Sequence, residues 1–167
     1  MRTDFFAHSK EVPVQDEFYI FDEQNQTPVK LLLDSHGIEH GYIVVNNDLH
    51  LSVGFIPVDN KIKFYRDDGT EDNVCDALVF TDRRVTFIEI KDVKGRWKAV
   101  AKKQVEATIA YYNLSYPEEK RRKQAYLCNV AKEFSPCGIV TASNKEEKET
   151  FFKKFRTRLF VGNIVFI

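Results

Sequence analysis

The clearest hydrophobic pattern is a pair of apolar segments in the middle of the chain. Residues 74–80 (VCDALVF) and 85–91 (VTFIEIK) are rich in β-branched and aromatic residues, and the short polar segment 81–84 joins them. Two β-rich segments separated by a tight polar turn are typical of a β-hairpin. We therefore predict two neighbouring antiparallel strands there.

Similar apolar or alternating segments predict further strands on both sides of this hairpin, with turn residues such as Asn46-Asn47-Asp48 between them. The strands expected before the hairpin lie within 12–21 and cover 42–45, 49–56 and 61–66. The strands expected after it cover 125–130, 138–141 and 158–167, the last being a single strand or a hairpin.

Three segments predict helices. Residues 97–113 contain neither Gly nor Pro, and their apolar side chains gather on one side at helical spacing. Residues 145–155 have a similar helical composition. Thr27-Pro28 has the features of a helix start, and a short helix is expected to run from there to Gly37, a suitable C-terminal cap.

This order of elements predicts an α/β protein of the mixed α+β kind, with a central mixed β-sheet flanked by helices. The length of 167 residues suits one domain. Within the single domain 1–167 we expect an irregular N-terminal extension (1–26), a core (27–130), and a C-terminal helix and strand (131–167).

Composition narrows the classes of protein to which the chain can belong. No apolar run reaches the length of a membrane helix, so we expect no membrane partner. The cysteines Cys75, Cys128 and Cys137 are odd in number and form no CxxC pair, which favours free thiols and a cytoplasmic location.

The formal net charge of zero conceals two oppositely charged halves. Residues 1–82 carry a net charge of −10 and residues 83–167 a net charge of +10. Such an asymmetry is typical of a basic region that binds a polyanion. The alternative is that the halves simply pack together and attract each other across a solvated surface.

Three charged residues occupy the otherwise apolar hairpin. Asp76 lies in the first segment, and Glu89 and Lys91 lie two residues apart in the second, so they should share one face of their strand. A hard divalent cation relieves the repulsion between two neighbouring carboxylates. An ammonium group beside them can orient or deprotonate a water molecule and can stabilise negative charge on a phosphate. The structural alternative is a cross-strand ion-pair ladder on a solvated face.

Gln104 is a fourth candidate. It lies near the centre of the apolar side of the predicted 97–113 helix, where an aliphatic residue is expected. A polar side chain there needs a hydrogen-bond partner. It could bond the sheet backbone, or it could reach the same site as Glu89 and Lys91.

Together these residues resemble the PD-(D/E)XK nuclease superfamily, which has the restriction-endonuclease-like fold. The match is Asp76 on one strand, Glu89-Ile90-Lys91 on the next, and Gln104 on the helix that follows, with Cys75 where the family motif has Pro. The resemblance implies Mg²⁺ or Mn²⁺ bound by Asp76, Glu89 and the Ile90 carbonyl. It also implies that Lys91 activates the attacking water, that Gln104 supports the site, and that an acid from the first helix contributes, for which Asp34 and Glu39 are the candidates.

We therefore expect a magnesium-dependent endonuclease that hydrolyses phosphodiester bonds in DNA, with RNA as a second candidate substrate. Lys94, Arg96 and Lys98 are the expected contacts to the phosphate backbone. The alternative is a non-catalytic binding or immunity-type module that acts through a protein or nucleic-acid partner. Family members often dimerise, so the resemblance also implies a homodimer or a protein partner.

Overall fold

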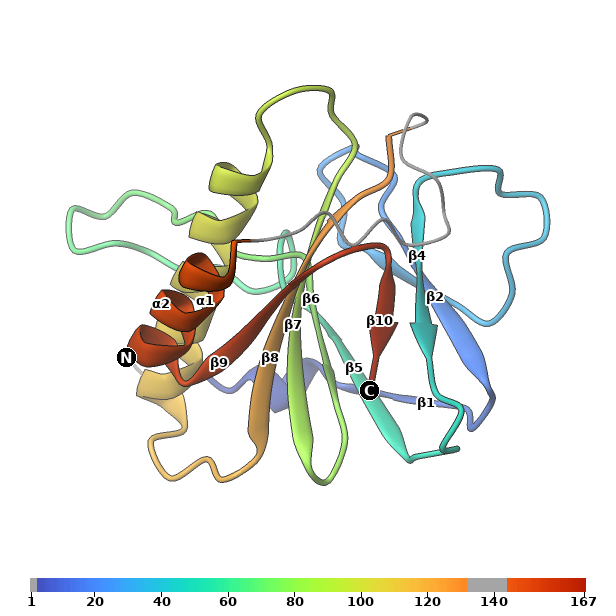
Figure 1. The fold of residues 1–167 in the computed structure, drawn as a ribbon, viewed down its shortest axis with the longest axis horizontal. Helices are drawn as coiled ribbons and strands as arrows, with labels where there is room; N and C mark the ends of the chain where they lie inside the picture. Colours follow the sequence, from blue (N-terminus) through green and yellow to red (C-terminus); the bar gives the residue numbers. More distant parts are fainter. Residues whose placement is uncertain (1–2, 132–143) are drawn as a thin grey trace.

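The computed structural model describes residues 3–131 and 144–167. Within these ranges the chain forms two β-sheets, two α-helices and one short 3-10 helix (Figure 1). In chain order the elements are η1 (Phe5–His8), β1 (Lys10–Val12), β2 (Glu17–Phe21), β3 (Lys30–Leu32), β4 (Tyr42–Asn46), β5 (Val53–Pro57), β6 (Ala77–Phe80), β7 (Arg84–Lys91), α1 (Lys98–Ser115), β8 (Arg122–Asn129), α2 (Lys145–Phe155), β9 (Thr157–Val161) and β10 (Ile164–Phe166).

The larger sheet has six strands in the order β1-β5-β6-β7-β8-β9. The first four are antiparallel neighbours, whereas β7, β8 and β9 run parallel. Because parallel neighbours need a crossover, α1 connects β7 to β8. The centre of β7 is buried on both faces, which explains its nearly continuous apolar sequence.

The smaller sheet has four strands in the order β10-β4-β2-β3. Strand β10 runs parallel to β4, and the other pairs are antiparallel. Although β9 and β10 are close in sequence, they belong to different sheets, so the chain passes from one sheet to the other at Gly162 and Asn163.

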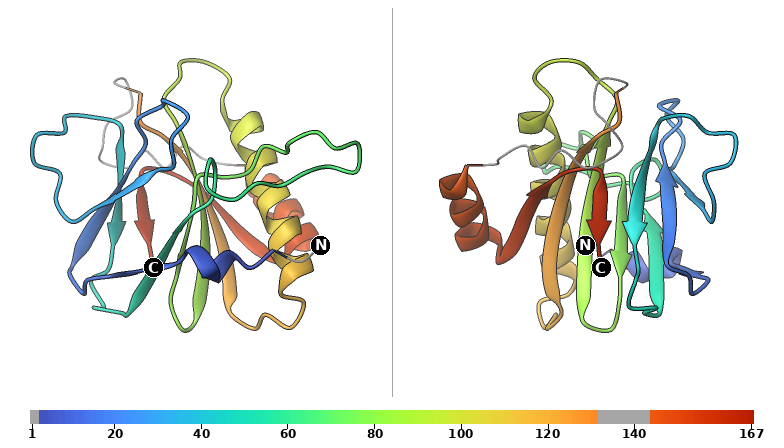
Figure 2. Two further views of the ribbon diagram at one scale, coloured as in Figure 1. Left: turned by 180° about the vertical axis from the view of Figure 1, so that it is seen from behind. Right: turned by 45° about the vertical axis from the view of Figure 1, so that its right-hand side comes forward.

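The sheets and helices form three layers, which are clearest in the right-hand view of Figure 2. Helices α1 and α2 cover one face of the six-stranded sheet and share an apolar core with it, in which Phe87, Val105 and Phe151 are buried. The four-stranded sheet covers much of the other face, and the core between the sheets includes Phe18 and Ile88. Neither helix among the described residues combines the length and apolar composition needed to cross a membrane.

The mixed α/β class with mixed sheets is confirmed, as are the 74–91 hairpin, the 97–113 helix and the 145–155 helix. The 42–45 strand is also confirmed, while the strands expected at 49–56 and 125–130 begin at Val53 and Arg122. The apolar stretch expected at 12–21 is divided between β1 and β2, with Pro13 between them. The expected strand at 138–141 lies outside the described residues.

Three expectations about local structure are wrong. Residues 1–26 are not an irregular extension, because β1 and β2 are strands of the two sheets and Phe5 and Phe18 are buried in the cores. Residues 27–37 do not form a helix; β3 pairs with β2 instead, with Leu31 opposite Ile20. A short helix is costly to nucleate, whereas pairing with an existing strand satisfies the backbone at once. Residues 61–66 form only an isolated bridge from Tyr65 to Glu71, because Ile62 and Phe64 pack into the helix-side core instead of pairing along a sheet.

Candidate functional site

The antiparallel hairpin brings the charged motif residues together at one end of the six-stranded sheet. Ala77 lies opposite Ile88, so Asp76 stands just before β6 and close to the end of β7. On β7, Phe87 packs in the helix-side core and Ile88 in the core between the sheets. Alternation along the strand therefore directs Glu89 and Lys91 to the helix side.

Asp76 is held by the backbone of the neighbouring strand. Its Oδ2 accepts a hydrogen bond of 2.5 Å from the backbone N–H of Ile90, at the point where β6 no longer supplies a carbonyl. The backbone N–H of Val58 donates to the Asp76 carbonyl at 2.8 Å. Burial raises the pKa of Asp76 to about 8, and the hydrogen bond from Ile90 opposes this shift only in part.

Glu89 is the most deeply buried charged group of the motif. Its exposed fraction is 0%, and neither carboxylate oxygen has a hydrogen-bond partner among the described residues. The Lys91 ammonium forms an ion pair with Oε1, and no other donor among the described residues reaches either carboxylate oxygen. Burial, followed by the nearby Asp76 charge, raises the pKa of Glu89 well above its usual value.

Lys91 is the cation of the site. Its side chain is 21% exposed, and it lies among three carboxylates, those of Glu89, Asp76 and Asp22. Burial by itself acts to lower the pKa of Lys91, but these negative charges outweigh it and raise the pKa. The ammonium group therefore stays protonated at neutral pH.

Gln104 extends from α1 to the same place. Its Nε2 donates a hydrogen bond of 3.1 Å to the Val74 carbonyl, so it does bond backbone close to the start of β6. It also lines a cavity with Asp76, Ile90 and Lys91. The Gln104 side chain therefore both bonds the backbone beside the sheet and lines the cavity.

The cavity has a volume of ≈ 200 Å³ and contains two acids that sequence reasoning missed. Asp22 directly follows β2, and Asp59 comes two residues after β5. Burial raises the pKa of both carboxyl groups, and Lys91 opposes the shift. Their only signal in the sequence is an acid just beyond an apolar strand, which is too common to identify a site.

The acids proposed for the first helix do not contribute. That helix is absent, and Asp34 and Glu39 are exposed in the segment between β3 and β4. Neither lines the cavity. Among the described residues, the additional acids that line this cavity are Asp22 and Asp59, which follow β2 and β5.

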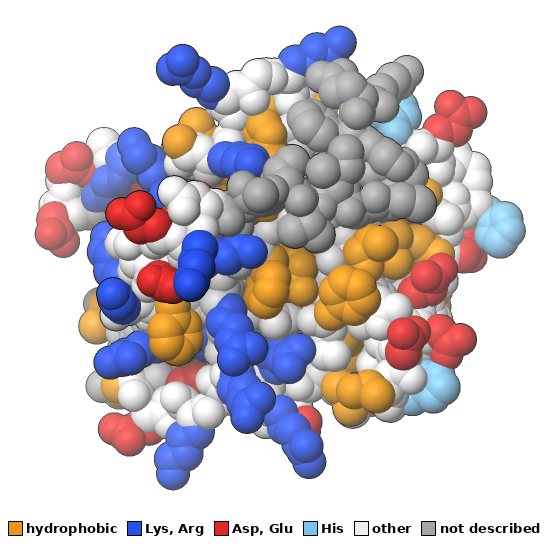
Figure 3. All heavy atoms as spheres, viewed as in Figure 1, with side chains coloured by type: hydrophobic (Ala, Val, Ile, Leu, Met, Phe, Trp, Pro, Cys, Tyr) orange, Lys and Arg blue, Asp and Glu red, His pale blue; other side chains and the backbone are white. Residues whose placement is uncertain are grey.

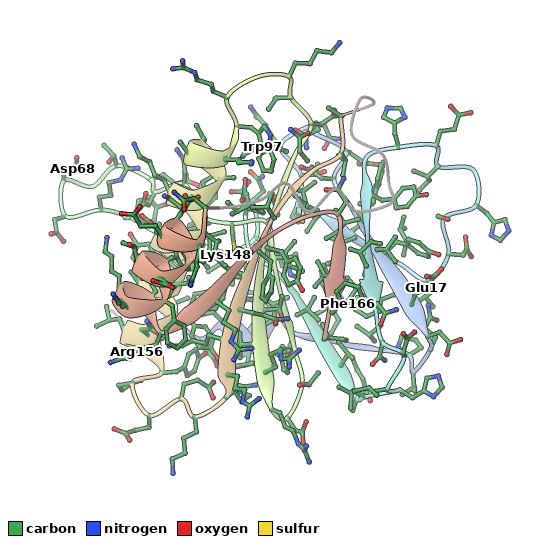
Figure 4. All side chains as sticks on the ribbon, viewed as in Figure 1. Glu17, Asp68, Trp97, Lys148, Arg156 and Phe166 are labelled. Carbon is green, nitrogen blue, oxygen red and sulfur yellow. The ribbon has the colours of Figure 1, made fainter. Side chains whose placement is uncertain are left out.

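The proposed phosphate contacts are near the site but outside the cavity. Lys94 and Arg96 are exposed in the segment between β7 and α1, and Lys98 is the half-buried first residue of α1. This segment and the β2–β3 loop rise at the same end of the molecule in both views of the sheets (Figures 1 and 2). Trp97, labelled in Figure 4, is buried at the start of α1. Because it is buried, its ring cannot stack on a base.

The donor set at this end of the sheet suits a hard divalent cation. Asp76 and the Ile90 backbone lie at the cavity, and the Glu89 carboxylate beside them lacks hydrogen-bond partners. Oxygen ligands of this kind are those that Mg²⁺ prefers. Across 3–131 and 144–167, however, no three His, Cys, Asp or Glu side chains are already gathered as a metal site. The two described cysteines, Cys75 and Cys128, are free and buried in the cores.

Comparison of the chain with protein-family models, with curated proteins and with solved structures found no significant match.

Proposed function

We propose that this protein is a metal-dependent nuclease of the PD-(D/E)XK type that hydrolyses phosphodiester bonds in DNA or RNA. The observation that carries the proposal is the convergence of Asp76, Glu89 and Lys91 at the open end of one hairpin, beside a polar cavity. An ion-pair ladder on a solvated face would not bury Glu89 completely or leave its oxygens without hydrogen bonds.

The order of elements around the site supports the same proposal. Strands β5, β6 and β7 are antiparallel neighbours, and α1 then leads to β8, which runs parallel to β7. This is the arrangement expected of a restriction-endonuclease-like core. The four-stranded sheet on the other face is an addition to that core, and its β2 end supplies Asp22 to the cavity.

In this proposal Asp76, Glu89 and the Ile90 carbonyl would hold Mg²⁺ or Mn²⁺. A bound divalent ion supplies Lewis acidity toward a phosphate oxygen and lowers the pKa of its bound water. Asp76 is positioned for its role by the Ile90 N–H, which fixes one of its oxygens. Gln104 is fixed by the Val74 carbonyl and contributes an amide to the cavity wall.

The electrostatics of Lys91 indicate which role it takes. Because surrounding carboxylates raise its pKa, Lys91 is a poor base at neutral pH. Its protonated ammonium can instead orient a water molecule and stabilise negative charge that develops on the phosphate. The exposed Lys94 and Arg96, between β7 and α1, can hold the phosphate backbone, together with Lys98 at the start of α1.

The test is cleavage of supercoiled DNA, single-stranded DNA and structured RNA with Mg²⁺ or Mn²⁺ present. We expect Lys91→Met to lower the cleavage rate about 100-fold or more, because the group that stabilises the reacting charge is lost. Lys103→Met, an exposed lysine on α1, is the matched control and should cleave like the wild type. Circular dichroism checks that both variants fold.

The alternative is the non-catalytic binding module, and one observation favours it. Glu89 has no exposed surface, and Lys91 is already in contact with it, so a metal ion must displace this ion pair to reach the carboxylate. If wild-type protein cleaves none of the three substrates with either metal but binds one of them, the binding module is correct and the nuclease proposal is wrong.

A further inference from the structure

A second basic feature lies on the opposite face of the six-stranded sheet, away from the helices. Alternation along the strands puts Arg84 of β7, Arg122 of β8 and Arg158 of β9 on the side of the core between the sheets, because Ile88, Tyr126 and Phe160 of the same strands face that way. We call these three arginines the arginine face. None of them belongs to the expected set of Lys94, Arg96 and Lys98.

The register places the arginine face on three adjacent strands. Arg84 lies directly opposite Arg122, and Arg158 lies opposite Gln124, two residues further along β8. Neighbouring strands are about 5 Å apart, so the three side chains leave the sheet close together. Like charges directly opposite each other on one face destabilise a sheet.

No acid among the described residues compensates these charges. Arg84, Arg122 and Arg158 form no salt bridge, whereas nearby acids are paired elsewhere: Glu119 with Arg121, and Asp82 with Arg83. Arg122 and Arg158 are exposed, and Arg84 is half-buried. The sheet therefore carries repulsion that an anionic ligand would relieve.

Two of the three arginines line a hollow in the surface, which Asp82 and Glu119 also line and of which Arg158 is not part. Arg84 and Arg122 line this hollow of ≈ 710 Å³ together with Lys120 and Arg121. Figure 3 shows Lys and Arg side chains gathered over the lower ends of β7 and β8. Acidic side chains in this view lie on the side of the four-stranded sheet and also on the opposite side, beyond the helices.

Aromatic side chains border the arginine face. Phe160, two residues from Arg158 on the same face, stacks on Tyr126 with ring centroids 4.9 Å apart. Phe166 of β10 is 55% exposed, and its backbone bonds Gln124 and Tyr126, so it lies beside the same part of β8 (Figure 4). Arginines combined with accessible aromatic rings are typical of surfaces that bind single-stranded nucleic acid.

We propose that the arginine face binds the phosphate backbone of single-stranded DNA or RNA, with bases against Phe160 and Phe166. The proposal extends the nuclease function, because it names a contact for the same class of substrate at a distance from the cavity. It does not require cleavage, since Arg84 lies at the end of β7 opposite to Lys91. An acidic protein segment is disfavoured because it would match the arginines but leave the exposed Phe166 ring without a stacking partner.

The test is fluorescence anisotropy with a labelled oligothymidylate in EDTA, repeated at several salt concentrations. We expect Arg84→Gln/Arg122→Gln/Arg158→Gln to weaken binding at least tenfold and to lower the slope of log K against log [salt] by about 2, as three lost phosphate contacts predict. The charge-matched control Lys10→Gln/Lys103→Gln/Lys153→Gln changes exposed lysines on β1, α1 and α2 and should bind like the wild type.

One further variant tests base stacking separately from charge. Phe166→Ala should weaken binding of the single strand and leave the salt slope unchanged, because it removes stacking and no charge. The measurement is made in EDTA, which removes the divalent ions that cleavage would need, so the outcome of this binding test does not depend on the outcome of the nuclease test. Equal binding by the triple arginine variant and the wild type, tighter binding of a duplex than of the single strand, or displacement of the oligonucleotide by polyglutamate at equal charge would each overturn the proposal.

Discussion

At the scale of single residues, Glu89 and Glu119 show two opposite ways of burying a carboxylate. Glu119 accepts hydrogen bonds from Tyr112 at 2.6 Å and from the Arg121 Nε at 3.0 Å, and this pairing lowers its pKa to about 2. Glu89 has only the ion pair with Lys91 and no hydrogen bond. A buried carboxylate without such partners lowers the stability of the folded state, and the proposed metal-binding role of Glu89 would account for its presence.

We expect Glu89→Gln to raise the free energy of unfolding by about 0.5–2 kcal/mol in the absence of divalent ions. Burial raises the pKa of Glu89 above its unfolded-state value, so at neutral pH the carboxyl group lowers the stability of the folded state, and a neutral side chain of the same size avoids this loss. Glu119→Gln is the matched control. It should lower the free energy of unfolding by about 1–3 kcal/mol, because it breaks charge-assisted hydrogen bonds. Urea unfolding measures both, and a loss of stability in Glu89→Gln would identify Glu89 as a structural residue.

At the scale of elements, the packing of the Phe80 ring across β5 depends on a single glycine. Gly54 lies opposite Phe80, and a Cβ atom added at Gly54 would stand 2.1 Å from the Phe80 Cζ. The ring of Phe80 is in turn packed edge-on against Phe6, with centroids 5.0 Å apart, and lies beneath the Arg121 guanidinium. A side chain at position 54 would therefore force the packed Phe80 ring to move.

We expect Gly54→Ala to lower the free energy of unfolding by about 1–3 kcal/mol, the usual range for an overpacked contact. The double variant Gly54→Ala/Phe80→Leu should lose less than the sum of the two single variants, because the smaller side chain removes the clash. Gly162→Ala, where an added Cβ meets nothing within 4 Å, is the control and should be nearly neutral. Urea unfolding of the four variants tests this, and strictly additive losses would contradict it.

At the scale of the whole molecule, the two apolar cores share the same strands. Strand β7 contributes Phe87 to the helix-side core and Ile88 to the core between the sheets, and β8 contributes Leu127 and Cys128 in the same way. Neither core can lose its packing without exposing the other. The described parts of the chain should therefore behave as one cooperative unit, as the single-domain expectation requires.

Urea unfolding followed by two probes tests this cooperativity. The only tryptophan, Trp97, is buried in the helix-side core, whereas far-UV circular dichroism reports on both sheets. We expect the two transitions to coincide in midpoint and slope. Separate transitions would show that the four-stranded sheet and the helix layer unfold independently.

Elements whose hydrophobic pattern is local could be predicted from the sequence alone, together with the residues that belong to them. The hairpin at 74–91 and the helices at 97–113 and 145–155 were predictable because each has a strong period and clear ends within a few residues. The same local pattern identified Asp76, Glu89, Lys91 and Gln104, since charged or amide groups in apolar segments stand out from their neighbours.

The pairing of segments that are distant in the chain is known from the three-dimensional structure and could not be predicted. Residues 30–32 form a strand because they pair with β2. Strands β9 and β10 do not form a hairpin, because each pairs within a different sheet. Neither outcome follows from a local pattern. Asp22 and Asp59 reach the cavity, and Arg84, Arg122 and Arg158 share a face, through pairings between residues far apart in the chain. The physical reason is that strand register is set by burial on both faces of a sheet, and that burial requires partners which the local sequence does not contain.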